Sequence, residues 1–87
     1  MSSSNFDLTE DASACAVFHC DGKKVTVEFY VDDRRVGDRL VFSRPEAVET
    51  GQRILESGVY SDFPIRLSPD CVKHFGARLR TYGETGR

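Results

Sequence analysis

Cysteine and histidine, the residue types in this chain best suited to metal binding or nucleophilic catalysis, fall in two short groups. The first is Cys15, His19 and Cys20, and the second is Cys71 and His74. Cys15 and His19 share one face of a segment with strand-like alternation, which separates them by about 13 Å at about 3.3 Å per residue. Zinc lies only about 2.0–2.3 Å from each ligand, and Cys20 points to the opposite face. We therefore expect no metal site and no cofactor.

The second group has a spacing that catalysis could use. Cys71 and His74 are three residues apart near the start of a predicted helix, where the backbone dipole favours a thiolate and a histidine one turn on could act as base. Cys71 also suits the edge of an apolar helical stripe, and no signature of an oxyanion site or substrate cleft accompanies it. We predict that the protein is not an enzyme, and rank a Cys/His metal or catalytic site as the third hypothesis.

Composition predicts one soluble domain. The chain has 87 residues, of which 30% are charged and 39% hydrophobic, with a formal net charge of −2. No apolar run approaches the roughly 20 residues that cross a bilayer, and the first residues lack the basic and apolar segments of a signal peptide. Three cysteines without regular spacing argue against a disulfide framework. These features predict a cytoplasmic protein without a membrane partner.

The clearest structural signal is a hairpin around Asp21-Gly22, because this dipeptide separates two segments of alternating apolar residues. A two-residue loop predicts that Phe18 faces Val25. Seven residues then share the core face: Ala14, Ala16, Phe18, Val25, Val27, Phe29 and Val31. The other face carries Cys15, Val17, His19, Lys24, Thr26, Glu28 and Tyr30.

Two further strands are predicted. A polar turn at 32–35 leads to a strand over 38–42, in which Leu40 and Phe42 point inward. Alternation returns over 63–67, where a proline within the segment places that strand at a sheet edge, because proline cannot donate to the ladder.

Two helices are predicted from repeated start signals, a serine followed by a proline and an acidic residue. The first helix follows its cap at Ser43 and runs to Ser57, with Gly58 as its stop. The second runs over 68–82, with Gly83 as its stop. Gly51 falls within the apolar stripe of the first helix, and we interpret it as allowing close approach of that helix to the sheet.

The predicted order β-β-β-α-β-α gives a two-layer α+β sandwich, with a mostly antiparallel four-stranded sheet and two helices packed on one of its faces. Residues 12–83 make up the single domain. Residues 1–11 are predicted to be a flexible, acidic, serine-rich tail, and residues 84–87 to fray.

This architecture leaves one sheet face open, and we predict that it binds a larger protein or protein complex. Domains of this size and composition are frequent among phage and mobile-element inhibitors, antitoxins and immunity proteins, so inhibition or regulation of the partner is expected. The residues predicted to make the contact are Tyr30, Arg34, Arg35, Arg39, Val17, His19 and Glu28. An edge strand could also pair with a second copy of the chain to make a homodimer.

The alternative is a nucleic-acid-binding module that uses the arginine-rich turn and a basic second helix. Its candidate residues are Arg44, Lys73, Arg78 and Arg80. Sheets that bind RNA present several stacking aromatic residues, whereas this open face offers only Tyr30, and the net charge is negative. Protein binding is therefore the leading hypothesis.

Overall fold

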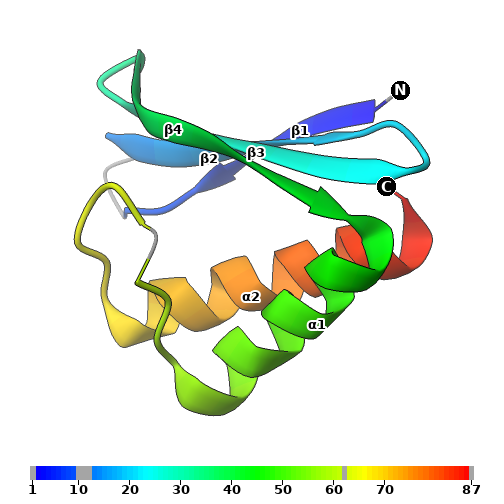
Figure 1. Cartoon of the computed structure of the whole chain (residues 1–87). Helices are drawn as coiled ribbons and strands as arrows, with labels where there is room; N and C mark the ends of the chain where they lie inside the picture. The colour runs from blue at the N-terminus through cyan, green and yellow to red at the C-terminus, as the bar shows by residue number, and fades with distance from the viewer. Residues whose placement is uncertain (1, 10–12, 62, 87) are drawn as a thin grey trace.

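The computed structural model has four strands followed by two helices (Figure 1). It describes residues 2–9, 13–61 and 63–86, with the backbone alone for residues 2–5. The strands are β1 (Ser2–Asp7), β2 (Ala14–Cys20), β3 (Lys24–Val31) and β4 (Arg34–Ser43), and the helices are α1 (Arg44–Ser57) and α2 (Pro69–Thr85). Both helices lie on the same side of the sheet, which confirms the predicted two-layer α+β sandwich with a four-stranded antiparallel sheet.

The segment that supplies the fourth strand of the sheet is not the predicted one. Its order is β1-β2-β3-β4, and every pair of neighbours is antiparallel. The tail predicted for residues 1–11 is wrong over residues 2–7, which form β1 along the edge of β2; residues 1, 10 and 11 lie outside the described part. Leu8, just after β1, is 1% exposed, and its N–H donates to the Ala14 carbonyl oxygen at 2.8 Å. Serine has little strand preference of its own, so pairing and this apolar anchor hold β1 in place.

The segment 63–67, predicted to be an edge strand, is irregular in the structure and connects α1 to α2. Its alternation still has a physical meaning, because Phe63, Ile65 and Leu67 all pack against the core. Pro64 lies against Gly37 of β4, so closely that a Cβ on Gly37 would come within 2.7 Å of the Pro64 Cβ. The side chains therefore point inward as expected, without a strand ladder.

The β2–β3 hairpin has four residues, 21–24, between its last paired positions, Cys20 and Val25, in place of the predicted two. One oxygen of Asp21 accepts hydrogen bonds from the backbone N–H groups of Lys23, at 3.0 Å, and Lys24, at 2.8 Å. The wider loop pairs Phe18 with Val27, so the predicted partner Val25 is wrong by two residues. A shift of two leaves every side chain on its predicted face, and the alternating burial of β2 and β3 confirms those faces.

The next hairpin is tighter than predicted. The strand expected over 38–42 extends over Arg34–Ser43, so only Asp32 and Asp33 remain as the turn, with φ values of 50° and 66°. Positive φ at both central residues is the geometry of a type I′ turn, which matches the twist of the flanking strands. The β3–β4 register then shifts between Val27 and Phe29, where β4 has an irregularity.

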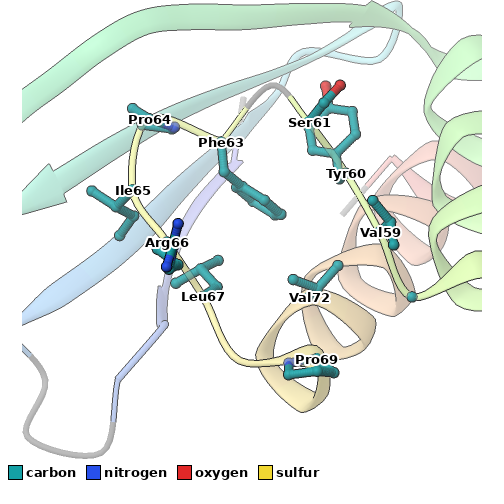
Figure 2. Close-up of a pocket in the computed structure, with 11 residues that line it drawn as sticks. Val59, Tyr60, Ser61, Phe63, Pro64, Ile65, Arg66, Leu67, Pro69 and Val72 are labelled. Atoms are coloured by element: carbon teal, nitrogen blue, oxygen red, sulfur yellow. The ribbon is translucent and has the colours of Figure 1, made fainter.

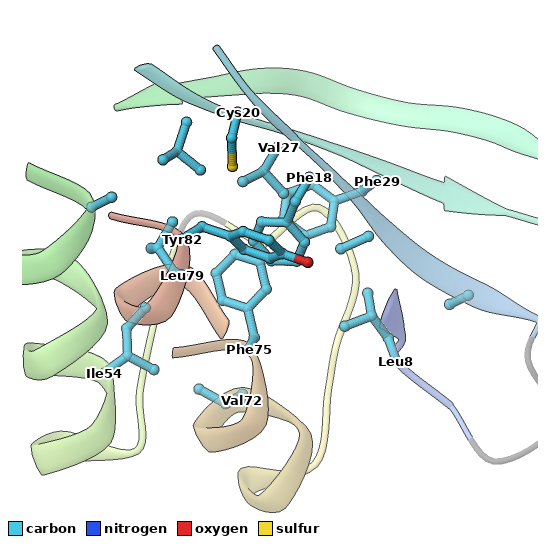
Figure 3. Close-up of a cluster of buried hydrophobic side chains, with 14 residues drawn as sticks. Leu8, Phe18, Cys20, Val27, Phe29, Ile54, Val72, Phe75, Leu79 and Tyr82 are labelled. Carbon is cyan, nitrogen blue, oxygen red and sulfur yellow. The ribbon is translucent and has the colours of Figure 1, made fainter. Parts of the chain in front are cut away.

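Aromatic side chains from the sheet and from α2 meet in the core between the two layers (Figure 3). The Phe18 ring lies 5.5 Å from the Phe75 ring and 4.9 Å from the Tyr82 ring, measured between centroids. Phe29 lies beside them, 5.7 Å from Phe75. Aromatic residues bury more apolar area than other side chains, so this cluster fixes how α2 lies across β2 and β3.

Glycines let the two helices approach each other. A Cβ on Gly51 would lie 2.6 Å from the carbonyl oxygen of Gly76 in α2, so the interpretation that Gly51 faces the sheet is wrong: it faces the other helix. Gly83 is likewise no helix stop. α2 continues to Thr85, and Gly83 is buried against the start of α1, where a Cβ would come within 2.8 Å of the Arg44 carbonyl oxygen.

The helix starts are confirmed, and so is the predicted stop of α1. The Ser43 hydroxyl accepts from the Glu46 N–H at 3.3 Å, and the Glu46 carboxylate accepts from the Ser43 N–H at 3.0 Å. Hydrogen bonds to the Glu46 carboxylate, first from the Ser43 N–H and then from the Ser43 side chain, lower the pKa of Glu46. Gly58 ends α1 with φ of 70°, and Ser68 caps α2.

Candidate functional site

The sheet face that points away from the helices is the predicted binding surface, and no described element covers it (Figure 1). Its residues come from alternate positions of the strands. Two rows cross β2, β3 and β4 through paired positions: Cys15 with Tyr30 and Arg35, and His19 with Thr26 and Val41. The row between them, Val17 with Glu28, has no paired residue on β4, because the β3–β4 register shifts there. We call this surface the open face, defined by Cys15, Val17, His19, Thr26, Glu28, Tyr30, Arg35 and Val41.

A carboxylate placed between a histidine and an arginine lies at the centre of the open face. Glu28 of β3 is 16% exposed at its side chain, with one oxygen 3.2 Å from His19 Nε2 on β2 and the other 3.4 Å from Arg35 Nη1 on β4. Ion pairs at a protein surface contribute only about 0–1 kcal/mol to stability. The effect of this arrangement is mainly positional, because it orients three side chains from three strands.

Tyr30 is half-buried in the neighbouring row, with Cys15 on one side and Arg35 on the other. Burial, and then the nearby carboxylates of Asp7 and Asp33, raise the pKa of the Cys15 thiol. A raised pKa leaves little thiolate at neutral pH, so Cys15 is a poor nucleophile. This row offers an aromatic contact surface and no reactive group.

Apolar contact area continues at both ends of the cluster. Val17 is half-buried and pairs with Glu28, while Val41 pairs with Thr26 and is 54% exposed. The structure therefore brings five of the seven predicted residues together. The other two, Arg34 and Arg39, are exposed on β4 at the sheet edge, and neither forms an ion pair with a described residue.

The residues of the nucleic-acid alternative are not brought together. Arg44 donates from Nε to the Gly83 carbonyl oxygen at 3.0 Å and from Nη2 to that of Glu84 at 2.8 Å, so it joins the start of α1 to the end of α2. Arg80 donates to Gln52 and to Glu84, both at 2.6 Å. Both guanidinium groups are occupied within the fold.

The other two basic residues of this alternative point in different directions. The Arg78 guanidinium lies over the ring of Phe6, 5.6 Å from its centroid, on the β1 side of α2. Lys73 lies near the end of α1, where a Cβ on Gly58 would be 3.4 Å from its Cε. The four residues therefore form no single basic patch for a phosphate backbone to follow.

The cysteines and histidines do not assemble into a reactive centre. Cys71 is half-buried and lines a cleft beside Leu8 and Ser13, whereas His74 is exposed and is not part of the cleft lining. Across residues 2–9, 13–61 and 63–86, no group of three or more histidine, cysteine or acidic side chains is placed to hold a metal ion. Cys15, Cys20 and Cys71 are free thiols.

A second surface feature was not predicted: a cleft of about 520 Å³ between the end of α1 and the start of α2 (Figure 2). We call it the connector cleft. Its lining is mainly apolar and comes from Val59, Tyr60, Phe63, Ile65, Leu67 and Val72, with Arg66 among them. The signal in the sequence was Pro64, which interrupts a short apolar segment and favours a loop over a strand.

Comparison of the chain with models of protein families, with curated proteins and with solved structures found no match. Within the described residues, neither helix combines the length and the apolar character that a bilayer crossing requires.

Proposed function

We propose that the protein is a small, non-enzymatic binding module that attaches to a larger protein through the open face and thereby inhibits or regulates it. The observation that carries this proposal is the composition of that face. Half-exposed Tyr30 and Val17 and the exposed Val41 surround a carboxylate held between His19 and Arg35. Protein interfaces combine apolar and aromatic contacts with oriented polar groups in this way.

A protein suits this face better than a nucleic acid as partner. The Arg35 guanidinium is paired with the Glu28 carboxylate, which also contacts His19, whereas binding to a phosphate backbone depends on unpaired cations. Tyr30 is the one aromatic residue among those that define the open face, so stacking of successive bases has little support. Two of the four residues proposed for nucleic acid are occupied by bonds within the fold.

We also propose that the protein acts in the cytoplasm. The three free thiols support this location, because cysteines of secreted small domains are usually paired in disulfides.

The test is affinity capture from lysate of the native host with the tagged chain and two variants of the open face, Tyr30→Ala and Arg35→Glu. We expect one protein partner in stoichiometric amount with the unmodified chain, surviving nuclease and about 0.5 M salt, where charges are screened beyond about 4 Å. Both variants should lose it. Lys73→Glu is the matched control, because it reverses a charge on α2, far from the open face, and should keep the partner.

Two results would refute the proposal. Loss of the captured protein after nuclease treatment would show that nucleic acid links it to the chain. Equal capture by Tyr30→Ala, Arg35→Glu and the unmodified chain would place the partner on another surface. Far-UV circular dichroism on each variant separates loss of binding from loss of fold.

A further inference from the structure

We propose that the connector cleft is a second binding site, which takes the C-terminal end of a polypeptide: an apolar last side chain together with its terminal carboxylate. The site does not depend on the open face, because its residues come from the segment between the helices and from α2 (Figure 2). Its volume of about 520 Å³ lies within the range of roughly 300–1,000 Å³ that is usual for ligand pockets.

The floor of the cleft is held in place by aromatic contacts. The Phe63 ring packs edge-on against Phe75, at 4.8 Å between centroids, and against Phe29, at 5.5 Å. Tyr60 packs edge-on against Phe63 at 5.1 Å. Figure 2 shows the Phe63 ring directed into the space between Tyr60, Leu67 and Val72. A binding site that is ordered before its ligand arrives loses less entropy on binding.

The rim offers apolar surface that the fold itself does not use. Val59 is 68% exposed, more than Val41, the other large exposed apolar residue of the described chain. Ile65 and Leu67, across the cleft from Val59 in Figure 2, are half-buried. Apolar residues gathered at the surface around a hollow are typical of binding sites, and they favour an apolar side chain as the occupant.

The positive charge of Arg66 favours a carboxylate as the polar part of the ligand. Arg66 is the one charged residue of its described lining, and its guanidinium has no hydrogen bond or ion pair with a described residue. It also lines the neighbouring cleft with Asp70, and the two form no ion pair. The fork of N–H donors on a guanidinium matches the two oxygens of a carboxylate.

A chain end fits this cleft better than a free small molecule. Pockets for small molecules usually bury about 70–90% of the ligand, whereas the walls here, apart from the buried Val72, are half-exposed or exposed residues. A polypeptide can place its last side chain on Phe63 and its carboxylate at Arg66 while the chain before it stays in solvent. Recognition of C-terminal carboxylates is an established mode of peptide binding.

The test is a titration of the full chain with a hexapeptide that ends in two leucines, as the free acid and as the C-terminal amide, followed by ¹H–¹⁵N correlation spectra. We expect the acid to bind about fivefold more tightly than the amide, because the arginine–carboxylate contact is charge-assisted but partly screened by solvent. Signals of the lining residues should shift, and those of the open face, such as Glu28, should not.

Arg66→Gln should make the acid and the amide bind equally, while Arg53→Gln should keep the difference. Arg53 is the matched control because it lines an adjacent cleft but already pairs with Glu49. Val59→Ser should weaken both peptides and keep their ratio.

Three results would overturn the proposal. They are equal binding of acid and amide to the unmodified chain, no shift of the lining signals at about millimolar peptide, and tighter binding of octanoate than of the peptide acid. The last would assign the cleft to a small carboxylate. None of these readouts involves capture through the open face, so the two proposals can fail separately.

Discussion

Replacing Gly51 with alanine should destabilise this protein, although the same change in an exposed helix is stabilising by about 1 kcal/mol. The added Cβ would lie 2.6 Å from the Gly76 carbonyl oxygen and 2.7 Å from the Arg80 nitrogen, whereas ordinary contact begins at 3.4 Å. Both atoms belong to the backbone of α2, so no change of rotamer can relieve the overlap. The helices must separate locally by about 0.8 Å, the difference between 3.4 and 2.6 Å.

The size of the effect follows from two opposing terms. Overpacking of a well-packed interface costs about 1–3 kcal/mol, and the upper end applies here because the clash is with backbone. The gain in helix propensity offsets about 1 kcal/mol of this. We expect a net loss of about 2 kcal/mol in the free energy of unfolding. For a domain of this size, that corresponds to a fall of roughly 10 °C in Tm.

The assay is urea and thermal unfolding of Gly51→Ala, followed by far-UV circular dichroism. Glu49→Ala is the control, because Glu49 is exposed on the same helix and its ion pair with Arg53 is a surface pair, so its Tm should hardly change. A Gly51→Ala protein that is as stable as the unmodified chain, or more stable, would refute the inference that α1 and α2 are in contact at this glycine.

Three further perturbations test other parts of the fold. Asp33→Gly should raise the free energy of unfolding, measured in urea, by about 0.5–1 kcal/mol, because Asp33 has φ of 66° and glycine adopts this conformation without strain. A lower urea midpoint would contradict the positive φ of this turn residue. Arg44→Gln should lower the free energy of unfolding by about 1–2 kcal/mol, since it removes the donors to the carbonyl oxygens of Gly83 and Glu84. It should also speed amide hydrogen exchange in the last turn of α2, and unchanged exchange would contradict a role of Arg44 in holding that turn. Two backbone N–H bonds lower the pKa of Asp21, so the stability it contributes is fully present above its ordinary pKa of about 3.9 and is lost as the pH falls through the lowered value. Asp21→Asn should therefore lose stability less steeply below about pH 4, and parallel acid unfolding curves of the two proteins would argue against the hydrogen bonds.

Local sequence signals were reliable where the physical cause is itself local. Ser43 and Ser68 cap helices because their hydroxyls accept from N–H groups three residues on, and Gly58 ends α1 because it adopts positive φ. The hairpin faces were also predictable, since alternation survives a register shift of two residues.

Features that depend on distant parts of the chain could not be predicted in the same way. The neighbour of Gly51 is Gly76, and no local pattern distinguishes a glycine that faces a helix from one that faces a sheet. β1 has a serine-rich sequence with weak strand preference, and its pairing is supplied by β2. Apolar and polar residues alternate over 63–67 because every second side chain packs against the core. A strand and an irregular loop can both produce this pattern.

In the open face, too, the locally determined features were predictable and those that depend on strand pairing were not. Alternation predicted which side chains point outward, but the contacts among them depend on register. The predicted register sets His19 opposite Lys24 and Glu28 opposite Cys15. In the structure His19 pairs with Thr26, which brings Glu28 diagonally within 3.2 Å of it. The binding role of this face stays a prediction, while the connector cleft became visible only once the irregular segment was placed.

The sheet order β1-β2-β3-β4 follows the order of the chain, and this has a consequence for how the protein folds. Each strand pairs with its immediate predecessor, so the meander can assemble by closing short loops one after another. The long closures are made by α2, whose Phe75 and Tyr82 reach back to Phe18. Since long closures cost more chain entropy than short ones, we expect α2 to dock onto the sheet after the meander has formed.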